Sequence, residues 1–177
     1  SRIEFLIQGS GGVKASKQEN TSRKDLWNPL LEVSRFEKHS LVVSGEIYTL
    51  AVGDFNGDGR ADIAYTTDEK NLVVRFHGKT MADWNEKREF PLDSVLTDGE
   101  SLVAADLNGD KRTDLAVLTR TRLMVYLQGL NGEWTTHTYA LTEPGCTGLQ
   151  VADVDGDGLP DLFMTSADGT AILVRLQ

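Results

Sequence analysis

Cysteine, proline and long apolar runs are all scarce in this chain. The 177 residues include one cysteine, Cys146, and four prolines. A single cysteine cannot form a disulfide within the chain, which excludes the class of small domains held together by disulfides. The longest apolar runs have about five residues. A transmembrane helix needs roughly 20, so we expect no membrane span.

Positive charge is scarce as well. The chain carries 18 Lys and Arg against 27 Asp and Glu, a formal net charge of −9, and it has no basic stripe. Phosphate binding requires clustered Lys and Arg, so nucleic acid is excluded as a partner. Ten of the acidic residues lie in three short clusters, and three bound dications would leave a net charge of −3. The acidity is therefore local.

The chain contains an internal repeat. Residues 50–62, 102–114 and 149–161 align without a gap, and each runs from an apolar stretch into an Asp-rich loop. The first aspartates of these loops are 52 and 47 residues apart. Each loop is followed by two short apolar stretches that a turn separates, at residues 63–65 and 72–76, 115–117 and 123–127, and 162–164 and 172–176. Each unit therefore predicts the order strand, loop, strand, turn, strand.

A fourth strand is predicted at the end of each complete unit, at residues 88–92 and 136–141, after loops that carry Trp84 and Trp134. No segment is long enough or periodic enough for a sizeable helix. Four short antiparallel strands in about 45 to 50 residues are typical of a propeller blade. The predicted fold class is all-β, a partial or assembling β-propeller with about three four-stranded blades plus a partial blade.

The repeat also predicts the blade boundaries. Residues 1–8 and 170–177 both align with 121–128, which is a third strand, so the successive strand counts are two, four, four and three. Because such an open array exposes strand edges, we expect self-association or a larger ring, with irregular four-bladed closure as the alternative. The predicted parts are residues 1–48, the outer half of a preceding blade with a polar loop; 49–100, the blade with the first calcium loop; 101–147, the blade with the second; and 148–177, an incomplete blade with the third.

Oxygen-bearing side chains occupy positions 1, 3, 5 and 9 of each loop, counted from its first aspartate. The first loop is residues 54–62, the second 106–114 and the third 153–161. Glycine at position 6 permits a positive φ, and the backbone carbonyl at position 7 can turn inward. Flexible oxygen ligands favour calcium over magnesium, so three calcium ions are predicted. The predicted ligands are Asp54, Asn56, Asp58, Arg60 and Asp62; Asp106, Asn108, Asp110, Arg112 and Asp114; and Asp153, Asp155, Asp157, Leu159 and Asp161, with Arg60, Arg112 and Leu159 contributing their carbonyls.

The start of this pattern also matches an EF-hand. An EF-hand loop requires a bidentate Glu at position 12. Position 12 is Tyr65, Val117 or Met164 here, inside an apolar stretch that is predicted to be a strand. The loops are therefore interpreted as nine-residue loops carried between strands.

The three loops resemble the calcium loops of FG-GAP and VCBS-type repeats. Such repeats occur in integrin α-subunit propellers, in many secreted bacterial proteins and in a similar fungal lectin. The resemblance covers residues 45–177 and, more weakly, the half-blade before them. It implies a propeller in which the loops hold calcium in a structural role, in an extracellular, cell-surface or periplasmic protein. The Phe-Gly and Gly-Ala-Pro elements of the integrin type are missing, so the bacterial type is the closer match.

No catalytic motif is visible. His39, His77 and His137 fall at unrelated points of the repeat, beside no Ser or Cys nucleophile motif. We therefore expect a scaffold or interaction module, not an enzyme, that presents loops to a protein or glycan ligand. The alternatives are a lectin-like propeller, whose sugars would stack on Trp27, Trp84 and Trp134, and a non-catalytic domain of a larger secreted enzyme.

The three loops are expected to differ in affinity for calcium. The third carries four aspartates and keeps Gly158 at position 6, so it should bind most tightly. The first keeps Gly59 but has the neutral Asn56 at position 3. The second also has Asn at position 3, and Lys111 replaces the glycine with a strained backbone and an opposing charge, so it should bind most weakly.

Overall fold

A computed structural model describes residues 1–8, 36–80, 82–97, 100–141, 145–166, 168–169 and 172–175. It divides into two compact units, residues 1–44 and 45–177. In the first unit, β1 (Arg2–Gln8) pairs antiparallel with β2 (Phe36–Val42) over their full length. The polar loop predicted from residue 9 to residue 25, and Trp27, lie outside the described residues.

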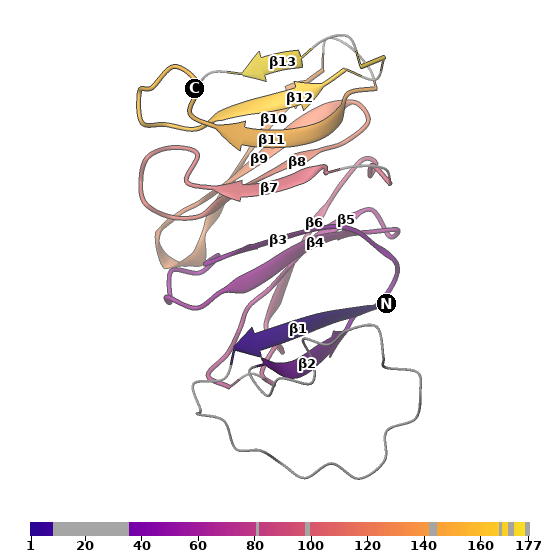
Figure 1. The fold of residues 1–177 in the computed structure, drawn as a ribbon, viewed down its shortest axis with the longest axis vertical. Helices are drawn as coiled ribbons and strands as arrows, with labels where there is room; N and C mark the ends of the chain where they lie inside the picture. The colour runs from indigo at the N-terminus through magenta and orange to yellow at the C-terminus, as the bar shows by residue number, and fades with distance from the viewer. Residues whose placement is uncertain are drawn as a thin grey trace. The chain divides into compact units, whose positions relative to one another are not determined.

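The second unit contains three antiparallel sheets, each of which follows the chain from strand to neighbouring strand (Figure 1). The first sheet has four described strands, the second four and the third three. They are β3 (Ile47–Gly53), β4 (Asp62–Thr67), β5 (Asn71–Arg75) and β6 (Lys87–Pro91); β7 (Leu102–Ala105), β8 (Asp114–Leu118), β9 (Arg122–Gln128) and β10 (Trp134–Ala140); and β11 (Thr147–Ala152), β12 (Asp161–Thr165) and β13 (Ile172–Arg175). A 3-10 turn, η2 (Leu130–Gly132), precedes β10.

The three sheets confirm the all-β, partial propeller predicted from the repeat. Sequence placed the fourth strands within two residues of β6 and β10. One detail was wrong: Trp134 is the first residue of β10 and not part of the preceding loop, because its backbone already pairs with Gln128 of β9.

The same register closes each Asp-rich loop. The last residue of the strand before the loop faces the ninth residue of the loop: Gly53 faces Asp62, Ala105 faces Asp114, and Ala152 faces Asp161. The loop therefore spans the gap between two paired strands, and its position-9 aspartate is the first residue of the next strand. This pairing fixes both ends of every loop.

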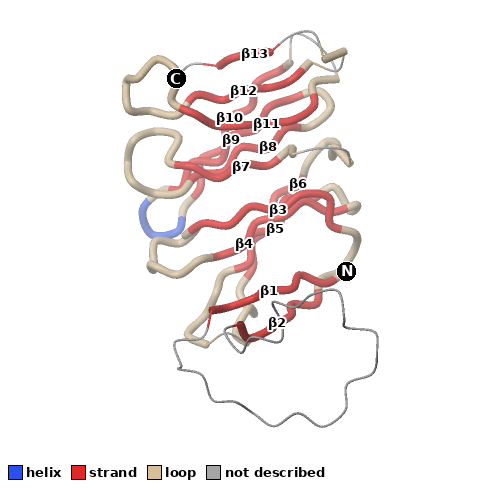
Figure 2. Tube along the Cα trace, viewed as in Figure 1, coloured by secondary structure: helices blue, strands red, loops and turns tan. Residues whose placement is uncertain are grey.

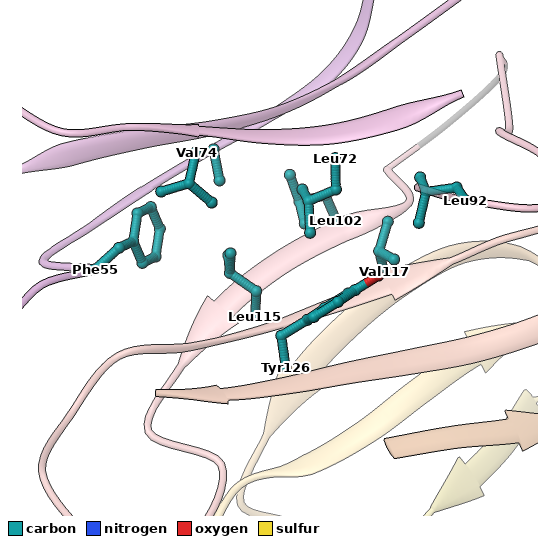
Figure 3. Close-up of a cluster of buried hydrophobic side chains, with 9 residues drawn as sticks. Phe55, Leu72, Val74, Leu92, Leu102, Leu115, Val117 and Tyr126 are labelled. Carbon is teal, nitrogen blue, oxygen red and sulfur yellow. The ribbon is translucent and has the colours of Figure 1, made fainter. Parts of the chain in front are cut away.

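The hydrophobic core of the second unit lies between successive sheets. Because side chains alternate along a strand, β7 serves both neighbours: Leu102 packs in the cluster shared with the first sheet, and Val103 packs against the cluster shared with the third. Figure 3 shows the first of these clusters, with side chains of the two sheets pointing toward one another. Its buried members are Phe55, Ala64, Leu72, Val74, Leu92, Leu102, Leu115, Val117 and Tyr126.

The second cluster joins the second and third sheets. Its buried members are Leu107, Ala116, Leu118, Leu123, Val125, Cys146, Leu149, Leu162 and Met164. The cysteine is thus a small core residue. β4 and β8 are inner strands of their sheets, and every residue of both is buried. The first two loops therefore lead directly into fully buried strands.

Candidate functional site

The three Asp-rich loops leave the sheets at the same edge of the second unit. Figure 2 shows them as the tan connections on the left of the view, between β3 and β4, β7 and β8, and β11 and β12. Each connection thus joins the first and second strands of its sheet. Twelve of the fifteen residues predicted as ligands therefore lie on three equivalent connections, and the three position-9 aspartates begin the strands that follow.

The position-1 aspartate is the hydrogen-bonding centre of each loop. The carboxylate of Asp54 accepts bonds from the backbone N–H groups of Gly57 at 2.7 Å, Asp58 at 3.1 Å and Gly59 at 2.8 Å. Asp106 and Asp153 accept equivalent bonds, with Lys111 N to Asp106 Oδ2 at 2.7 Å and Gly158 N to Asp153 Oδ2 at 3.0 Å. The loop thus curls around one carboxylate.

The position-9 aspartates are buried, with exposed fractions of 0% for Asp62, 0% for Asp114 and 3% for Asp161. Their carboxylates accept backbone bonds from position 2, at 2.9 Å from Phe55 N to Asp62 Oδ2 and 2.9 Å from Leu107 N to Asp114 Oδ2. A carboxylate has about four acceptor directions, so these bonds leave capacity for a cation.

Burial raises the pKa of Asp114 to about 6. The backbone bonds from Gln128 and Leu107 lower that pKa, while the carboxylates of Asp110 and Asp106 raise it further. Burial likewise raises the pKa of Asp62, and Asp58 and Asp54 add to the rise. Ionising Asp62 or Asp114 therefore costs more than ionising an exposed aspartate, and a nearby cation would offset that cost.

Positions 3 and 5 close two tight turns within each loop. The side-chain oxygen at position 3 accepts from the N–H at position 5, and the carboxylate at position 5 accepts from the N–H at position 7, as in Asp157 N to Asp155 Oδ1 at 3.1 Å and Leu159 N to Asp157 Oδ1 at 2.7 Å. In the third loop, carboxylate oxygens of Asp153, Asp155 and Asp161 all lie within 4.8 Å of one another. These three carboxylates converge on one point.

The first two loops differ from the third in the side chain at position 7. The guanidinium of Arg60 forms an ion pair with Asp58, and that of Arg112 forms one with Asp110. The third loop has Leu159 at this position. Sequence analysis considered only the carbonyl at position 7 and missed the internal cation, which the recurrence of arginine two residues after an aspartate could have indicated.

Each of these arginines also ties its loop to the end of the third strand of the sheet. Arg60 Nε donates to the carbonyl oxygen of His77 at 2.9 Å, and Arg112 Nε donates to that of Gln128 at 2.7 Å. The N–H groups of the same two residues donate to the position-9 aspartates. The loop and the strand end therefore form one connected network.

The backbone at position 6 has the positive φ predicted for it, +81° at Gly59, +88° at Gly158 and 68° at Lys111. The lysine is strained by this conformation, which L-residues with a Cβ rarely adopt. Sequence analysis missed a second such position: glycine at position 4 also has a positive φ in every loop, and its recurrence in all three was the available signal.

A family model for FG-GAP-like repeats matches residues 54–117 and 106–164. The two matches together span more than half of the chain. The chain belongs to the FG-GAP-like repeat family. Repeats of this family form β-propellers, are typically non-catalytic and mediate protein interactions in extracellular or surface proteins. Within the described residues, no helix is long and apolar enough to cross a membrane.

The loops of this FG-GAP-like chain fit a calcium ion by their chemistry. Each offers carboxylate, amide and carbonyl oxygens on a curled backbone, which is the ligand set of a hard, flexible-shell cation. Two of the position-9 aspartates supply a second sign, because burial raises the pKa values of Asp62 and Asp114 and neighbouring carboxylates raise them further, a cost that a bound cation would offset. The fit is closest in the third loop, where three carboxylates converge.

Two of the three tryptophans considered for sugar stacking, Trp84 and Trp134, are engaged in packing, and Trp27 lies outside the described residues. Trp84 is 7% exposed and its ring stacks on His77 at 4.7 Å between centroids. Trp134 lies against Phe55 and Phe90, at 6.4 and 5.8 Å. His77 is also less exposed than a surface histidine, because its Nε2 atom is buried without a hydrogen-bond partner.

Proposed function

We propose that this FG-GAP-like chain is a calcium-stabilised propeller module that presents its loops to a protein partner and carries no catalytic site of its own. Each loop binds one calcium ion through the side chains at positions 1, 3, 5 and 9 and the carbonyl at position 7. The observation that carries the proposal is the set of buried carboxylates at position 9, of which Asp62 and Asp114 have raised pKa values.

The role of the ion is structural. Calcium supplies the positive charge that a buried carboxylate such as Asp114 requires. The chain's own residues do the positioning: the position-1 aspartate gathers the loop N–H groups, and the position-9 aspartate anchors the loop to a central strand. An ion held between them joins the start of the loop to the buried strand and resists separation of the first two strands of the sheet.

The module is assigned to an extracellular, cell-surface or periplasmic setting. Sites of extracellular modules bind calcium with affinities of about 0.1 to 1 mM, which matches calcium concentrations outside cells. A protein partner is favoured over a glycan because the ring of Trp84 is buried against His77 and Trp134 packs against the first core cluster. Within this proposal the blades are residues 49–100, 101–147 and 148–177, and residues 1–48 belong to a preceding blade.

Self-association is part of the proposal. Position 2 of each loop is apolar, and it is 0% exposed at Phe55 and Leu107 but 57% exposed at Val154. The first two pack between sheets, and the third leaves an apolar side chain that a second copy of the chain can cover. Light scattering across a concentration series tests this: the mass should rise with concentration, and Val154→Asp should abolish the rise.

Thermal melting with EDTA, with calcium and with magnesium tests the calcium function. With affinities of about 0.1 mM and calcium at about 1 mM, each site should add about 1.4 kcal/mol of unfolding free energy. A variant with Asp54→Asn, Asp106→Asn and Asp153→Asn should lose the calcium-induced shift. The charge-matched control is Glu86→Gln, Glu100→Gln and Glu133→Gln, three exposed positions outside the loops, which should keep it. An unchanged melting midpoint on adding calcium to the wild type would reject the function.

A further inference from the structure

Gln128, the last residue of β9, lies between the first and second loops. Gln128 is only 2% exposed, which is unusual for a glutamine. Its side-chain amide has two N–H donors and an oxygen that can accept two hydrogen bonds. A buried amide is normally hydrogen-bonded, and the partners of this one belong to the first and second loops.

The side chain of Gln128 reaches from the second sheet into the first. Its Nε2 donates to the carbonyl oxygen of Asp54 at 2.9 Å and to that of Thr113 at 3.1 Å. Asp54 is position 1 of the first loop, and Thr113 is position 8 of the second. The two loops approach closely here: a Cβ added to Gly53 would lie 2.7 Å from Cγ2 of Thr113.

The backbone of Gln128 belongs to the second loop's own network. Its N–H donates to Asp114 Oδ1 at 2.7 Å, and its carbonyl oxygen accepts from Arg112 Nε at 2.7 Å. One residue therefore holds position 9 and position 7 of the second loop by its backbone, and position 1 of the first loop by its side chain.

The equivalent strand end of the first sheet carries a different side chain, and residue 177, which the repeat aligns with Gln128 in the third sheet, lies outside the described residues. His77 occupies the equivalent place in the first sheet, and its N–H also donates to a position-9 carboxylate, that of Asp62, at 2.7 Å. Its ring, however, stacks on Trp84 of its own sheet. The second and third loops meet through an apolar approach, in which a Cβ at Gly109 would lie 2.8 Å from Cδ2 of Leu159.

We propose that Gln128 is a positioning residue that couples the first two calcium loops, so that occupation of the second loop raises the affinity of the first, and the reverse. This inference rests on the proposed calcium function. The third loop is outside the coupled pair, because the hydrogen bonds of Gln128 reach only the first and second loops.

The coupling depends on how well ordered the end of β9 is. Without calcium, Arg112 pairs with Asp110 but the carboxylates of Asp106 and Asp114 still repel one another, and the end of β9 that is bonded to Asp114 loosens with them. Loosening withdraws the Gln128 amide from the Asp54 carbonyl and frees position 1 of the first loop. Ordering the second loop removes part of the entropy loss that the first loop undergoes on binding, which is positive coupling.

A double-mutant cycle measured by calcium titration calorimetry tests the coupling. All proteins carry Asp153→Asn, so that the third loop does not contribute heat. The affinity of the first loop is compared with the second loop intact and with Asp106→Asn, in the wild-type, Gln128→Met and Arg88→Gln backgrounds. Methionine keeps the length of the side chain and removes the donor. Arg88 is the matched control, because its Nη1 donates to the Gly132 carbonyl at 2.6 Å, a bond between the same two sheets away from the loops.

We expect Asp106→Asn to weaken the first loop about fivefold in the wild-type and Arg88→Gln backgrounds, and less than about twofold with Gln128→Met. Amide hydrogen exchange without calcium supplies a second readout: Gln128→Met should speed exchange at Gly57 and Gly59, whose N–H groups bond to Asp54, and Arg88→Gln should not. If Gln128→Met does not fold, Gln128→Leu takes its place in the cycle.

The outcomes separate the two proposals. If Asp106→Asn does not change the calcium affinity of the first loop, the coupling is overturned and the calcium function stands. The same holds if Asp106→Asn still weakens the first loop in the Gln128→Met background. Absence of any calcium heat from the first loop of the wild type overturns both.

Discussion

The first two loops and the third share one backbone design, yet they handle their negative charge differently. Arg60 and Arg112 place a guanidinium on the position-5 aspartate, so the first and second loops contain an internal cation. The third has Leu159 there and a fourth carboxylate, Asp155, at position 3. The comparison indicates that the third loop depends most on an external ion, and that the first two can keep their shape with less help.

The loops also differ in how they join the core. Phe55 and Leu107 are fully buried between sheets, whereas Val154 is 57% exposed. Position 2 donates its N–H to the position-9 carboxylate in all three loops. Core packing of Phe55 and Leu107 holds this bond in place in the first two loops, and the exposed Val154 gives no such packing in the third. The third loop is thus the least anchored as well as the most charged.

The largest expected effect contrasts position 2 in the first and third loops. Phe55→Ala should lower the unfolding free energy by about 3 to 5 kcal/mol, because it leaves a cavity in the cluster with Leu115 and Tyr126. Val154→Ala should lower it by less than about 1 kcal/mol. Urea unfolding in saturating calcium measures both. Equal losses of unfolding free energy in the two variants would show that Val154 supports its loop as much as Phe55 does, despite its exposure.

The next effect concerns pH and changes sign with calcium. In calcium-free buffer, the raised pKa of Asp114, about 6 against an ordinary 3.8, means that the folded state binds this proton more tightly than the unfolded state. The unfolding free energy contributed by this group should therefore rise as pH falls from about 7 to about 4, by at most about 3 kcal/mol. In saturating calcium the ion favours the ionised form, so acidification should instead weaken the fold.

Urea unfolding between pH 4 and 7.5, with and without calcium, checks that sign change. Asp114→Asn is the control, because it removes one of the two titrating groups and should reduce the calcium-free pH dependence, leaving the contribution of Asp62. A calcium-free profile that falls steadily on acidification in the wild type would contradict the raised pKa as the dominant influence.

A smaller effect tests the internal cation directly. Arg112→Gln removes the guanidinium from Asp110 and should raise the calcium affinity of the second loop about fivefold, while it lowers calcium-free stability by less than about 1 kcal/mol, as expected for a partly exposed ion pair. The reciprocal change, Leu159→Arg, should weaken the third loop by a similar factor. Calorimetry on variants that retain one intact loop measures each affinity.

The same titrations rank the three sites. The third loop should bind most tightly and the second most weakly, since the third combines four carboxylates with no internal cation. If Asp106→Asn, and not Asp153→Asn, removed the tightest binding event, then charge and backbone conformation would not determine the order.

The smallest effect isolates backbone strain at position 6. Lys111→Gly should raise stability by up to about 1 kcal/mol and strengthen calcium binding in the second loop, because φ is 68° there. Lys70 is the matched control: it is also a lysine at positive φ, 58°, in the turn between β4 and β5, outside any loop. Lys70→Gly should stabilise the fold comparably and leave calcium affinity unchanged. If both variants raised calcium affinity equally, the gain could not come from relief of strain at Lys111 itself.

The repeat, the strand order, the positions of the loops and the positive φ at position 6 are all visible in the amino-acid sequence. These features are local: an apolar stretch, an Asp-rich loop and a glycine act within about a dozen residues, so their pattern repeats visibly along the chain. The second positive φ, at position 4, was equally visible and was overlooked.

Which side chains contact one another across the sheets depends on tertiary packing. The amide of Gln128 bonds to Asp54, 74 residues away in sequence, because the stacking of sheets brings the two loops together. The same stacking buries Phe55 and Leu107 and leaves Val154 exposed, although all three stand at one position of the repeat. A repeated motif specifies its own turn, but its neighbours across the sheet interface differ at every copy, and contacts at long sequence separation leave no periodic trace.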